Sequence, residues 1–196
     1  MEFDKVINKR KSTRSFKDKR ASFKDAIIAI DSAIKGPFAG NHNNLKFVIV
    51  EDTDTIKKIS EFANQPWISQ VGLLILVCSD DKHLEHMYGE RGRVYSRQQV
   101  GAAINTILLK LTELGLDSCW VGAYTDELIK NMLGIPGHIQ IEAILPVGYE
   151  KPIKGKEKKA KKREIGSNML YWGVWERSRR PVMMKEQPDP DSLRAD

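Results

Sequence analysis

The feature that most constrains the fold is the uninterrupted apolar run Leu73–Cys78. A strand with one face in water alternates apolar and polar residues, whereas a continuous apolar run is typical of a strand buried on both faces. The run is also far shorter than the roughly 20 residues that a membrane-spanning helix needs. We therefore predict a strand at the centre of a sheet that helices cover on both sides, and no membrane-spanning segment.

The rest of the chain supplies the helices and further strands. Apolar residues recur at helical spacing from Val100 to Leu114, and Gly115 is placed to end that helix. The residues placed to begin other helices are Ser22, Asp52 and Thr125, and the other predicted strands are Lys46–Val50, Cys119–Val121 and Ile139–Val147. Alternating helices and strands predict an α/β or α+β sandwich in which helices cover a mostly buried sheet, and their order alone does not fix the strand topology. We expect one domain over residues 1–175 and a polar tail over residues 176–196.

The helix that begins at Ser22 has a broad apolar face. Its members at helical spacing are Phe23, Ala26, Ile27, Ile30, Ala33 and Ile34. Helices of this kind are too apolar to be fully covered in one small subunit, which predicts a homodimer.

The positive charge is concentrated near the end of the sequence. The chain has 32 basic and 26 acidic residues, and the excess of six falls entirely within residues 151–196. Seven of the ten residues in Lys154–Arg163 are basic. Such a run can be a solvated loop, or it can attract nucleic acid, an anionic surface or a phosphate-bearing cofactor. The N-terminal residues become charged before an apolar signal region could form, so we expect a cytoplasmic protein.

Other reactive residues give weaker signals. Cys78 and Cys119 lack metal-ligand spacing, so we expect buried free thiols, and His83 and His86 lack a third ligand, so we expect no metal site. Several aromatic and arginine side chains precede the central helix, and they fit either aromatic packing beside solvated arginines or a ligand pocket: Trp67, Tyr88, Arg91, Arg93 and Tyr95.

Three segments suggest a ligand. In extended chain, Arg10-Lys-Ser-Thr-Arg14 would point residues 10, 12 and 14 the same way, which suits a phosphate, although a solvated basic loop has the same composition. The small and amide residues of Gly36–Asn44 could approach a flat ligand, or simply form a turn. Gly115–Ala123 enters a strand and leaves it through two residues too small to block a ligand.

The order and spacing of these segments resemble the nitroreductase family of flavin-dependent oxidoreductases over roughly residues 3–175. The matching motifs are Arg10-Lys-Ser-Thr-Arg-Ser-Phe16, Gly36-Pro-Phe-Ala-Gly-Asn41 with Lys46-Phe-Val-Ile-Val50, Gln65-Pro-Trp-Ile68, Ala102–Leu109 with Gly115–Ala123, Leu133-Gly-Ile-Pro136 and Leu145-Pro-Val-Gly-Tyr149. Phe38, Asn43 and Leu45 depart from the family's usual serine, glutamine and tryptophan.

The resemblance implies a nitroreductase-like fold, with a central, mostly antiparallel mixed sheet flanked by helices, in an intertwined homodimer that holds FMN at the subunit interface. It implies that Arg10, Lys11, Ser12 and Arg14 hold the FMN phosphate, with Lys162 and Arg163 returning to it. The residues implied to lie at the isoalloxazine and ribityl groups are Pro37, Phe38, Ala39, Asn41 and Asn43, from the other subunit, and Val121, Gly122 and Ala123 beside the reactive edge of the ring.

The resemblance also implies the reaction. NADH or NADPH would pass a hydride to flavin N5, and a small electron-poor acceptor, a nitroaromatic or a quinone, would then be reduced. The flavin carries the chemistry, so no catalytic side chain, metal or membrane partner is expected. Two alternatives stay open: a flavin-binding sensor or storage protein without NAD(P)H turnover, prompted by Phe38, and contact of the basic run with nucleic acid, the least favoured. The sequence leaves open the natural acceptor and the choice between NADH and NADPH.

Overall fold

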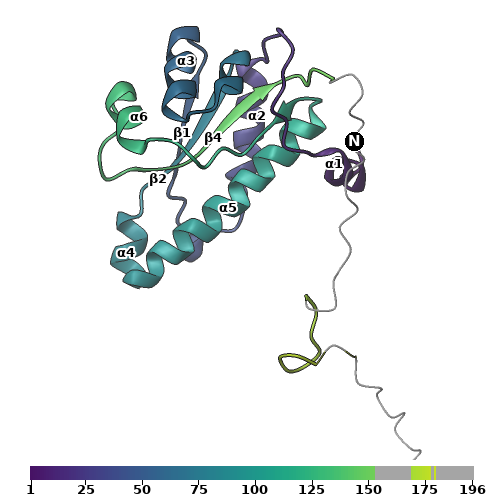
Figure 1. Ribbon diagram of the computed structural model, residues 1–196. Helices are drawn as coiled ribbons and strands as arrows, with labels where there is room; N and C mark the ends of the chain where they lie inside the picture. The colour runs from purple at the N-terminus through teal and green to yellow at the C-terminus, as the bar shows by residue number, and fades with distance from the viewer. Residues whose placement is uncertain (153–168, 178, 180–196) are drawn as a thin grey trace, which may run out of the picture. The chain divides into compact units, whose positions relative to one another are not determined.

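The computed structural model describes residues 1–152, 169–177 and 179 (Figure 1). Contacts divide the chain into two units, Met1–Lys154 and Gly155–Asp196, and each is described by itself. In the second unit, residues 171–177 form a turn in which the Trp172 N–H donates to the Arg177 carbonyl over 2.8 Å. Lys162 and Arg163, together with the whole of the basic run Lys154–Arg163 and most of the predicted tail, lie outside the described residues.

The first unit is built on a four-stranded sheet. Its strand order is β1 (Leu45–Val50), β2 (Leu74–Ser79), β4 (Gln140–Gly148) and β3 (Asp117–Ser118), and every pair is antiparallel. All six residues of β2 are buried. The central position predicted for the apolar run is confirmed.

Helices cover both faces of the sheet (Figure 1). Leu73, Ile75 and Val77 face one core cluster, with α2 (Phe23–Ala33) and α5 (Glu90–Glu113). Leu74, Leu76 and Cys78 face a second cluster, with α3 (Thr53–Phe62), the 3₁₀ turn η2 (Pro66–Gln70) and α6 (Asp126–Leu133). Alternate residues of one strand thus serve two cores, and the predicted α+β sandwich is confirmed.

The predicted helix ends carry the expected chemistry. The Ser22 hydroxyl accepts a hydrogen bond from the Lys24 N–H over 3.2 Å, and the Asp52 carboxylate accepts one from the Thr55 N–H over 2.8 Å. The hydrogen bonds from Thr55 hold the pKa of Asp52 below its usual value. Helix α5 ends before Gly115, whose φ of +82° is a conformation that glycine adopts without strain.

The strand predicted at Cys119–Val121 is wrong. Pairing with β4 occurs at Asp117–Ser118, stops, and resumes at Val121, which exchanges two 3.0 Å hydrogen bonds with Ile144. The same register would place Cys119 opposite Pro146, which has no N–H to donate. The proline therefore interrupts the ladder where the sequence predicts a continuous strand.

The apolar face of α2 is divided between the core and the surface. Its alanines, Ala26, Ala29 and Ala33, are buried in the cluster that contains α5, whereas Phe23 is 43% exposed and Ile27 is 49% exposed. Alanine lets two helices approach closely, so the small side chains face α5 and the large ones turn outward. The large apolar side chains remain uncovered in a single chain.

A tight hairpin joins α4 (Lys82–Tyr88) to α5 through Gly89. Gly92, in the first turn of α5, packs so closely on α4 that a Cβ there would collide with the Leu84 carbonyl. Glycine at position 92 is therefore what lets the two helices meet.

We predict that Gly92→Ala lowers the free energy of unfolding by about 1–3 kcal/mol, because backbone atoms of α4 would have to move. Urea denaturation measures the change. Gly137→Ala is the control, since a Cβ at Gly137 meets no atom within 4 Å, and it should change stability by less than about 0.5 kcal/mol. Equal stability of Gly92→Ala and the original protein would contradict this account of the hairpin.

Candidate functional site

The basic segment Arg10–Arg14 follows α1 (Phe3–Lys9) and lies along the β3 edge of the sheet. The Thr13 N–H donates to the Ser118 carbonyl over 3.0 Å. Lys11 forms an ion pair with Glu150, and the Thr13 side chain is buried. Of the odd-numbered side chains, Lys11 is therefore paired with a carboxylate and Thr13 is turned into the interior, where its hydroxyl has no hydrogen-bond partner among the described residues.

The even-numbered side chains meet at Cys119. Burial raises the pKa of the Cys119 thiol, and the charges of Arg14 and Arg10 and a hydrogen bond with Ser12 act in the opposite direction. The Ser12 hydroxyl is therefore next to the sulfur atom, and the charges of both arginines act on it. Within the described residues, neither Arg10 nor Arg14 forms an ion pair with a carboxylate, which leaves two guanidinium groups and a hydroxyl able to bind an anion.

The exit from the interrupted strand exposes backbone. Val121 is buried, and the following residues, Gly122 and Ala123, are exposed. Their N–H groups have no acceptor among the residues that the structure describes. The Gln65 amide donates to the Ala123 carbonyl over 3.4 Å, so a side chain that the sequence analysis placed only within a motif helps to hold this turn.

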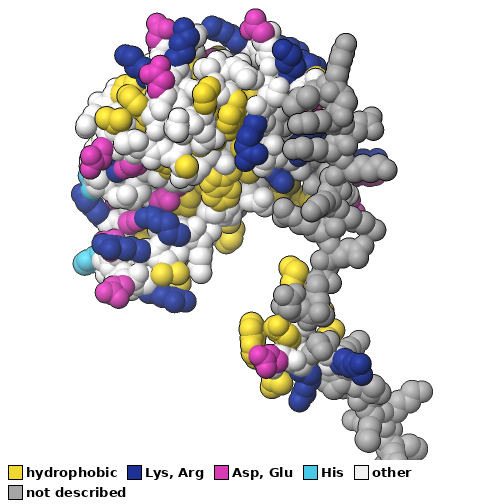
Figure 2. Space-filling view, in the orientation of Figure 1, with side chains coloured by type: hydrophobic (Ala, Val, Ile, Leu, Met, Phe, Trp, Pro, Cys, Tyr) yellow, Lys and Arg dark blue, Asp and Glu magenta, His cyan; other side chains and the backbone are white. Residues whose placement is uncertain are grey.

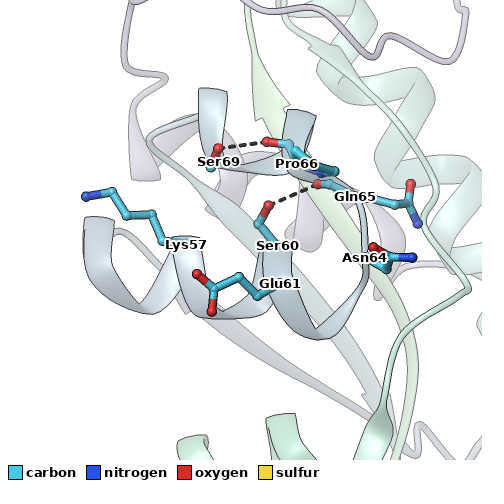
Figure 3. A pocket seen from close by; sticks show the side chains of 7 residues that line it. All are labelled: Lys57, Ser60, Glu61, Asn64, Gln65, Pro66 and Ser69. Atoms are coloured by element: carbon cyan, nitrogen blue, oxygen red, sulfur yellow. Dashed lines mark hydrogen bonds between the residues drawn. The ribbon is translucent and has the colours of Figure 1, made fainter.

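Gln65 also lines an open cavity of about 430 Å³ between α3 and η2 (Figure 3). The hydroxyls of Ser60 and Ser69 donate to the backbone carbonyls of Gln65 and Pro66, so both already have partners. The remaining polar groups in its lining are those of Lys57, Glu61, Asn64 and Gln65. No residue assigned to the flavin by the sequence resemblance lines this cavity.

The loop Gly36–Asn44 has a strained backbone that its sequence permits. Gly40 and Asn41, in the 3₁₀ turn η1 (Ala39–Asn41), have φ values of +57° and +55°, a region open to glycine and tolerated by asparagine. A Cβ on Gly40 would lie 2.7 Å from the Tyr88 hydroxyl, so a larger residue there would have to displace the Tyr88 side chain. Pro37 and Asn41 are exposed.

The loop is held against two elements. The half-buried Phe38 packs against the core cluster of α2 and α5, so its side chain does not stand free over a ligand face. The His42 ring lies against the His83 ring of α4, with centroids 3.9 Å apart, and partial burial together with the nearby His83 lowers the pKa of His42. Asn43 accepts from the Leu45 N–H over 2.9 Å, a local bond that fixes the entry into β1.

The residue that fixes this loop is Gln99 of α5, which no sequence motif singles out. The Gln99 carbonyl oxygen accepts from the Ala39 N–H over 3.1 Å, and its amide donates to the His42 carbonyl and to Asn44. Gln99 and Asn44 are both buried. A buried glutamine needs hydrogen-bond partners of this kind. In the sequence, however, Gln99 is recognisable only as a polar residue beside the apolar face of a helix, which does not indicate its partners.

The network continues into the core. Asn44 donates to Ser96 over 2.8 Å, Ser96 donates to Asp81 over 2.6 Å, and Arg97 forms ion pairs with Asp81 and Glu142. The register of β2 and β4 shifts at Val77 and Cys78, next to Glu142. The loop is thus tied through hydrogen bonds and ion pairs to α5, β2 and β4.

The structure does not bring the loop and the basic segment together within one chain. The loop is bonded to Gln99, whereas the N-terminus, two turns of helix before Arg10, lies 3.9 Å from Glu113 at the other end of α5. Helix α5 rises about 21 Å between these two residues. One chain therefore places two sets of predicted flavin contacts at separate positions along its longest helix.

The structure also locates the cysteines and histidines that the sequence singles out. Cys78 and Cys119 are free and buried, and burial raises the pKa of Cys78 to about 11. His83 and His86 lie exposed on α4, and no group of three metal-ligating side chains occurs among the described residues. None of the helices in the described ranges is long and apolar enough to cross a membrane.

Comparison with solved structures identifies the fold class first. The chain is similar to a nitroreductase family protein from Clostridium novyi, with a TM-score of 0.71 and 25% identity over 77% of this chain and 86% of that one. The sequence model of the nitroreductase family matches residues 60–149.

Two relatives extend the match. A protein of Archaeoglobus fulgidus, provisionally named NADH dehydrogenase/NAD(P)H nitroreductase, is 32% identical over 76% of this chain and 86% of its own length. An FMN reductase [NAD(P)H] of Bacillus subtilis is 24% identical over 85% of this chain and 73% of its own length. The chain belongs to the nitroreductase family, as the sequence motifs predict.

We predict that Gln99→Leu frees the loop, because the Ala39 N–H and the His42 carbonyl each lose a partner. The free energy of unfolding should fall by about 1–3 kcal/mol, and the Ala39 amide should exchange faster with deuterium. The neighbouring Gln98→Leu is the control, because Gln98 is exposed. Unchanged exchange at Ala39 in Gln99→Leu would show that other contacts hold the loop.

Proposed function

We propose that this chain is an FMN-dependent oxidoreductase that transfers electrons from NADH or NADPH to a small electron-poor acceptor, a nitroaromatic or a quinone. The observation that supports this most is that the Ser12 hydroxyl and the charges of Arg10 and Arg14 all act on the Cys119 thiol, while neither arginine forms an ion pair with a carboxylate in the described part of the chain. Membership of the nitroreductase family supports the same choice of cofactor, since relatives are named for FMN and for NAD(P)H.

The donor set fits the phosphate of FMN. Guanidinium groups bind phosphate oxygens with two parallel hydrogen bonds, and a serine hydroxyl adds a neutral donor. Lys11, already paired with Glu150, would contribute to the local positive potential rather than a direct bond. Lys162 and Arg163, which the family resemblance assigns to the phosphate, lie outside the described residues.

The exposed backbone at Gly122 and Ala123 suits the edge of a flavin ring. Neither residue carries a side chain large enough to exclude a planar group, and their N–H groups have no acceptor within the described ranges. Fixed N–H donors beside the ring would stabilise the negative charge of a reduced flavin. Val121, buried and hydrogen-bonded to Ile144, would hold these donors in place.

The redox chemistry would be supplied by bound FMN: a hydride from the nicotinamide to N5 in the first half-reaction, and from there to the acceptor in the second. The protein would bind the FMN, orient it and adjust its reactivity through nearby charges and hydrogen bonds. Pro37, Phe38, Ala39, Asn41 and Asn43 belong to a loop that the Gln99 network holds in one conformation, so they would meet the cofactor already organised.

The cofactor site requires a second copy of the chain. In one chain the loop and the basic segment lie far apart along α5, and the outward side chains of α1 and α2 are apolar: Phe3 is 66% exposed and Ile7 is 47% exposed. Figure 2 shows hydrophobic side chains exposed among the charged ones on one face. We therefore propose a homodimer in which one chain supplies the basic segment and its partner supplies the loop.

We predict that the purified protein binds FMN and that NADH or NADPH bleaches its absorbance under anaerobic conditions. Absorbance spectra before and after addition of each nucleotide make the measurement. A flavin that stays oxidised with both nucleotides would favour a flavin-binding protein without turnover, and a protein that takes up no FMN would contradict the proposal altogether.

The phosphate contacts have a matched control in riboflavin, which lacks the phosphate. Arg14→Gln should raise the dissociation constant of FMN at least about tenfold and leave that of riboflavin unchanged. Equal weakening of both flavins would place Arg14 at the ring or in the fold rather than at the phosphate.

We predict a mass of two chains in sedimentation equilibrium. Ile27→Glu should shift this mass towards one chain and weaken FMN binding, because a charge would replace an apolar contact. Lys24→Glu is the control, since Lys24 is exposed on the same helix and forms no ion pair within the described residues. A monomer that still binds FMN would rule out a site shared between chains.

A further inference from the structure

Aromatic side chains and one arginine extend from the proposed flavin loop along the start of α5. The Tyr88 hydroxyl lies against Gly40, and the Tyr88 ring meets the Tyr95 ring edge to face, with centroids 5.2 Å apart. The Arg91 guanidinium lies over the Tyr95 ring, 5.6 Å from its centroid. These contacts connect the loop to Arg91 through two aromatic rings.

Arg91 differs from the other arginines at this end of α5. Arg93 forms an ion pair with Glu85, and Arg97 forms ion pairs with Asp81 and Glu142. Among the described residues the partner of Arg91 is the Tyr95 ring, and a cation held over a ring keeps its N–H donors available at its edge. Arg91 therefore offers a positive charge that no carboxylate of the described chain neutralises.

The backbone beneath the group holds its parts in a fixed relation. Tyr88 ends α4, Arg91 and Tyr95 lie in the first turns of α5, and the close contact of Gly92 with Leu84 sets how the two helices meet. Tyr88 is 36% exposed, so its ring can contact both the loop and a ligand. The rings offer apolar surface to a planar molecule, and the guanidinium offers two parallel donors to a carboxylate.

We infer that Tyr88, Arg91 and Tyr95 form the acceptor subsite and that it selects an electron-poor aromatic acid, with Arg91 binding the carboxylate. This inference rests on the proposed function and deepens it by naming the class of acceptor. Arg91 could bind either of two anionic groups. One is the carboxylate of an aromatic acceptor, and the other is the 2′-phosphate of NADPH. Arg91 is a specificity-determining residue here, because it would contact the substrate away from the reacting atoms.

The first experiment measures binding without turnover. Benzoate and its neutral analogue benzamide are titrated into the oxidised holoprotein by calorimetry. The original protein should bind benzoate more tightly, and Arg91→Gln should weaken benzoate about tenfold with no change for benzamide. Arg91→Lys should keep part of the preference for benzoate, because lysine keeps the positive charge. The preference should stay below that of the original protein, because lysine lacks the two parallel donors of arginine. Equal affinities for the two ligands in the original protein would overturn the inference.

The second experiment measures turnover with 4-nitrobenzoate and 4-nitrobenzamide. Arg91→Gln should raise KM for 4-nitrobenzoate about tenfold without changing kcat. KM and kcat for 4-nitrobenzamide should stay the same. Arg93→Gln is the matched control, because it removes a charge two residues away that is already paired with Glu85. If Arg93→Gln has the same effect, the general positive potential is responsible and Arg91 is not a subsite.

The nucleotide comparison separates the remaining outcomes. A rise in KM for NADPH relative to NADH in Arg91→Gln, with the acid preference intact, would assign Arg91 to the nucleotide and overturn the acceptor assignment. Bleaching of the holoprotein by NAD(P)H tests the proposed function separately. If the protein prefers benzoate but NAD(P)H does not bleach it, the acceptor subsite stands and the proposed reaction is rejected. If NAD(P)H bleaches the protein but benzoate is not preferred, the proposed reaction stands and the subsite is rejected.

Discussion

Burial of β2 on both faces is the constraint on which the rest of the structure depends. Its alternate residues face two separate clusters, one under α2 and α5 and the other under α3 and α6. Because helices occupy both faces, a ligand cannot reach the faces of the sheet and must meet the chain at its edges, in its loops or on the outer surfaces of the helices. The basic segment lies along the β3 edge, and the loop Gly36–Asn44 leads into the edge strand β1. The core thus determines where a site can be before any site residue is chosen.

A second constraint is that buried polar groups need partners. Asn44, Gln99, Ser96 and Asp81 are buried, and each is hydrogen-bonded within one network. Any other conformation of the loop would leave a buried polar group without a partner, which costs free energy. The network therefore holds the loop in one conformation. The positive φ values at Gly40 and Asn41 persist because this network and the contact with Tyr88 surround them.

The sequence predicts what is local and misses what depends on distant partners. Caps at Ser22 and Asp52 are visible within four residues, and the alternation of residues 10, 12 and 14 needs only extended backbone. The break between Ser118 and Val121 depends on Pro146 across the sheet, and the role of Gln99 depends on Ala39, sixty residues away. Helical periodicity identifies an apolar face on α2, but it cannot say that the alanines turn inward and Ile27 outward.

The arrangement along α5 gives the proposed dimer a chemical reason as well as an apolar one. Exposed apolar surface indicates that another molecule covers α1 and α2, but it does not identify that molecule. The loop is bonded to Gln99, and the N-terminus that leads into the basic segment lies beside Glu113, about 21 Å further along α5. A two-fold axis through the midpoint between two such features would bring each feature of one chain near the other feature of its partner. Such pairing would complete two equivalent sites at once and cover the exposed side chains of α2 in the same step. The Tyr88–Arg91–Tyr95 group would then enter each site from the same chain as the loop, since Tyr88 contacts Gly40 directly. Cofactor phosphate and acceptor would therefore be bound by different chains, which makes the dimer a requirement of the chemistry rather than an addition to it.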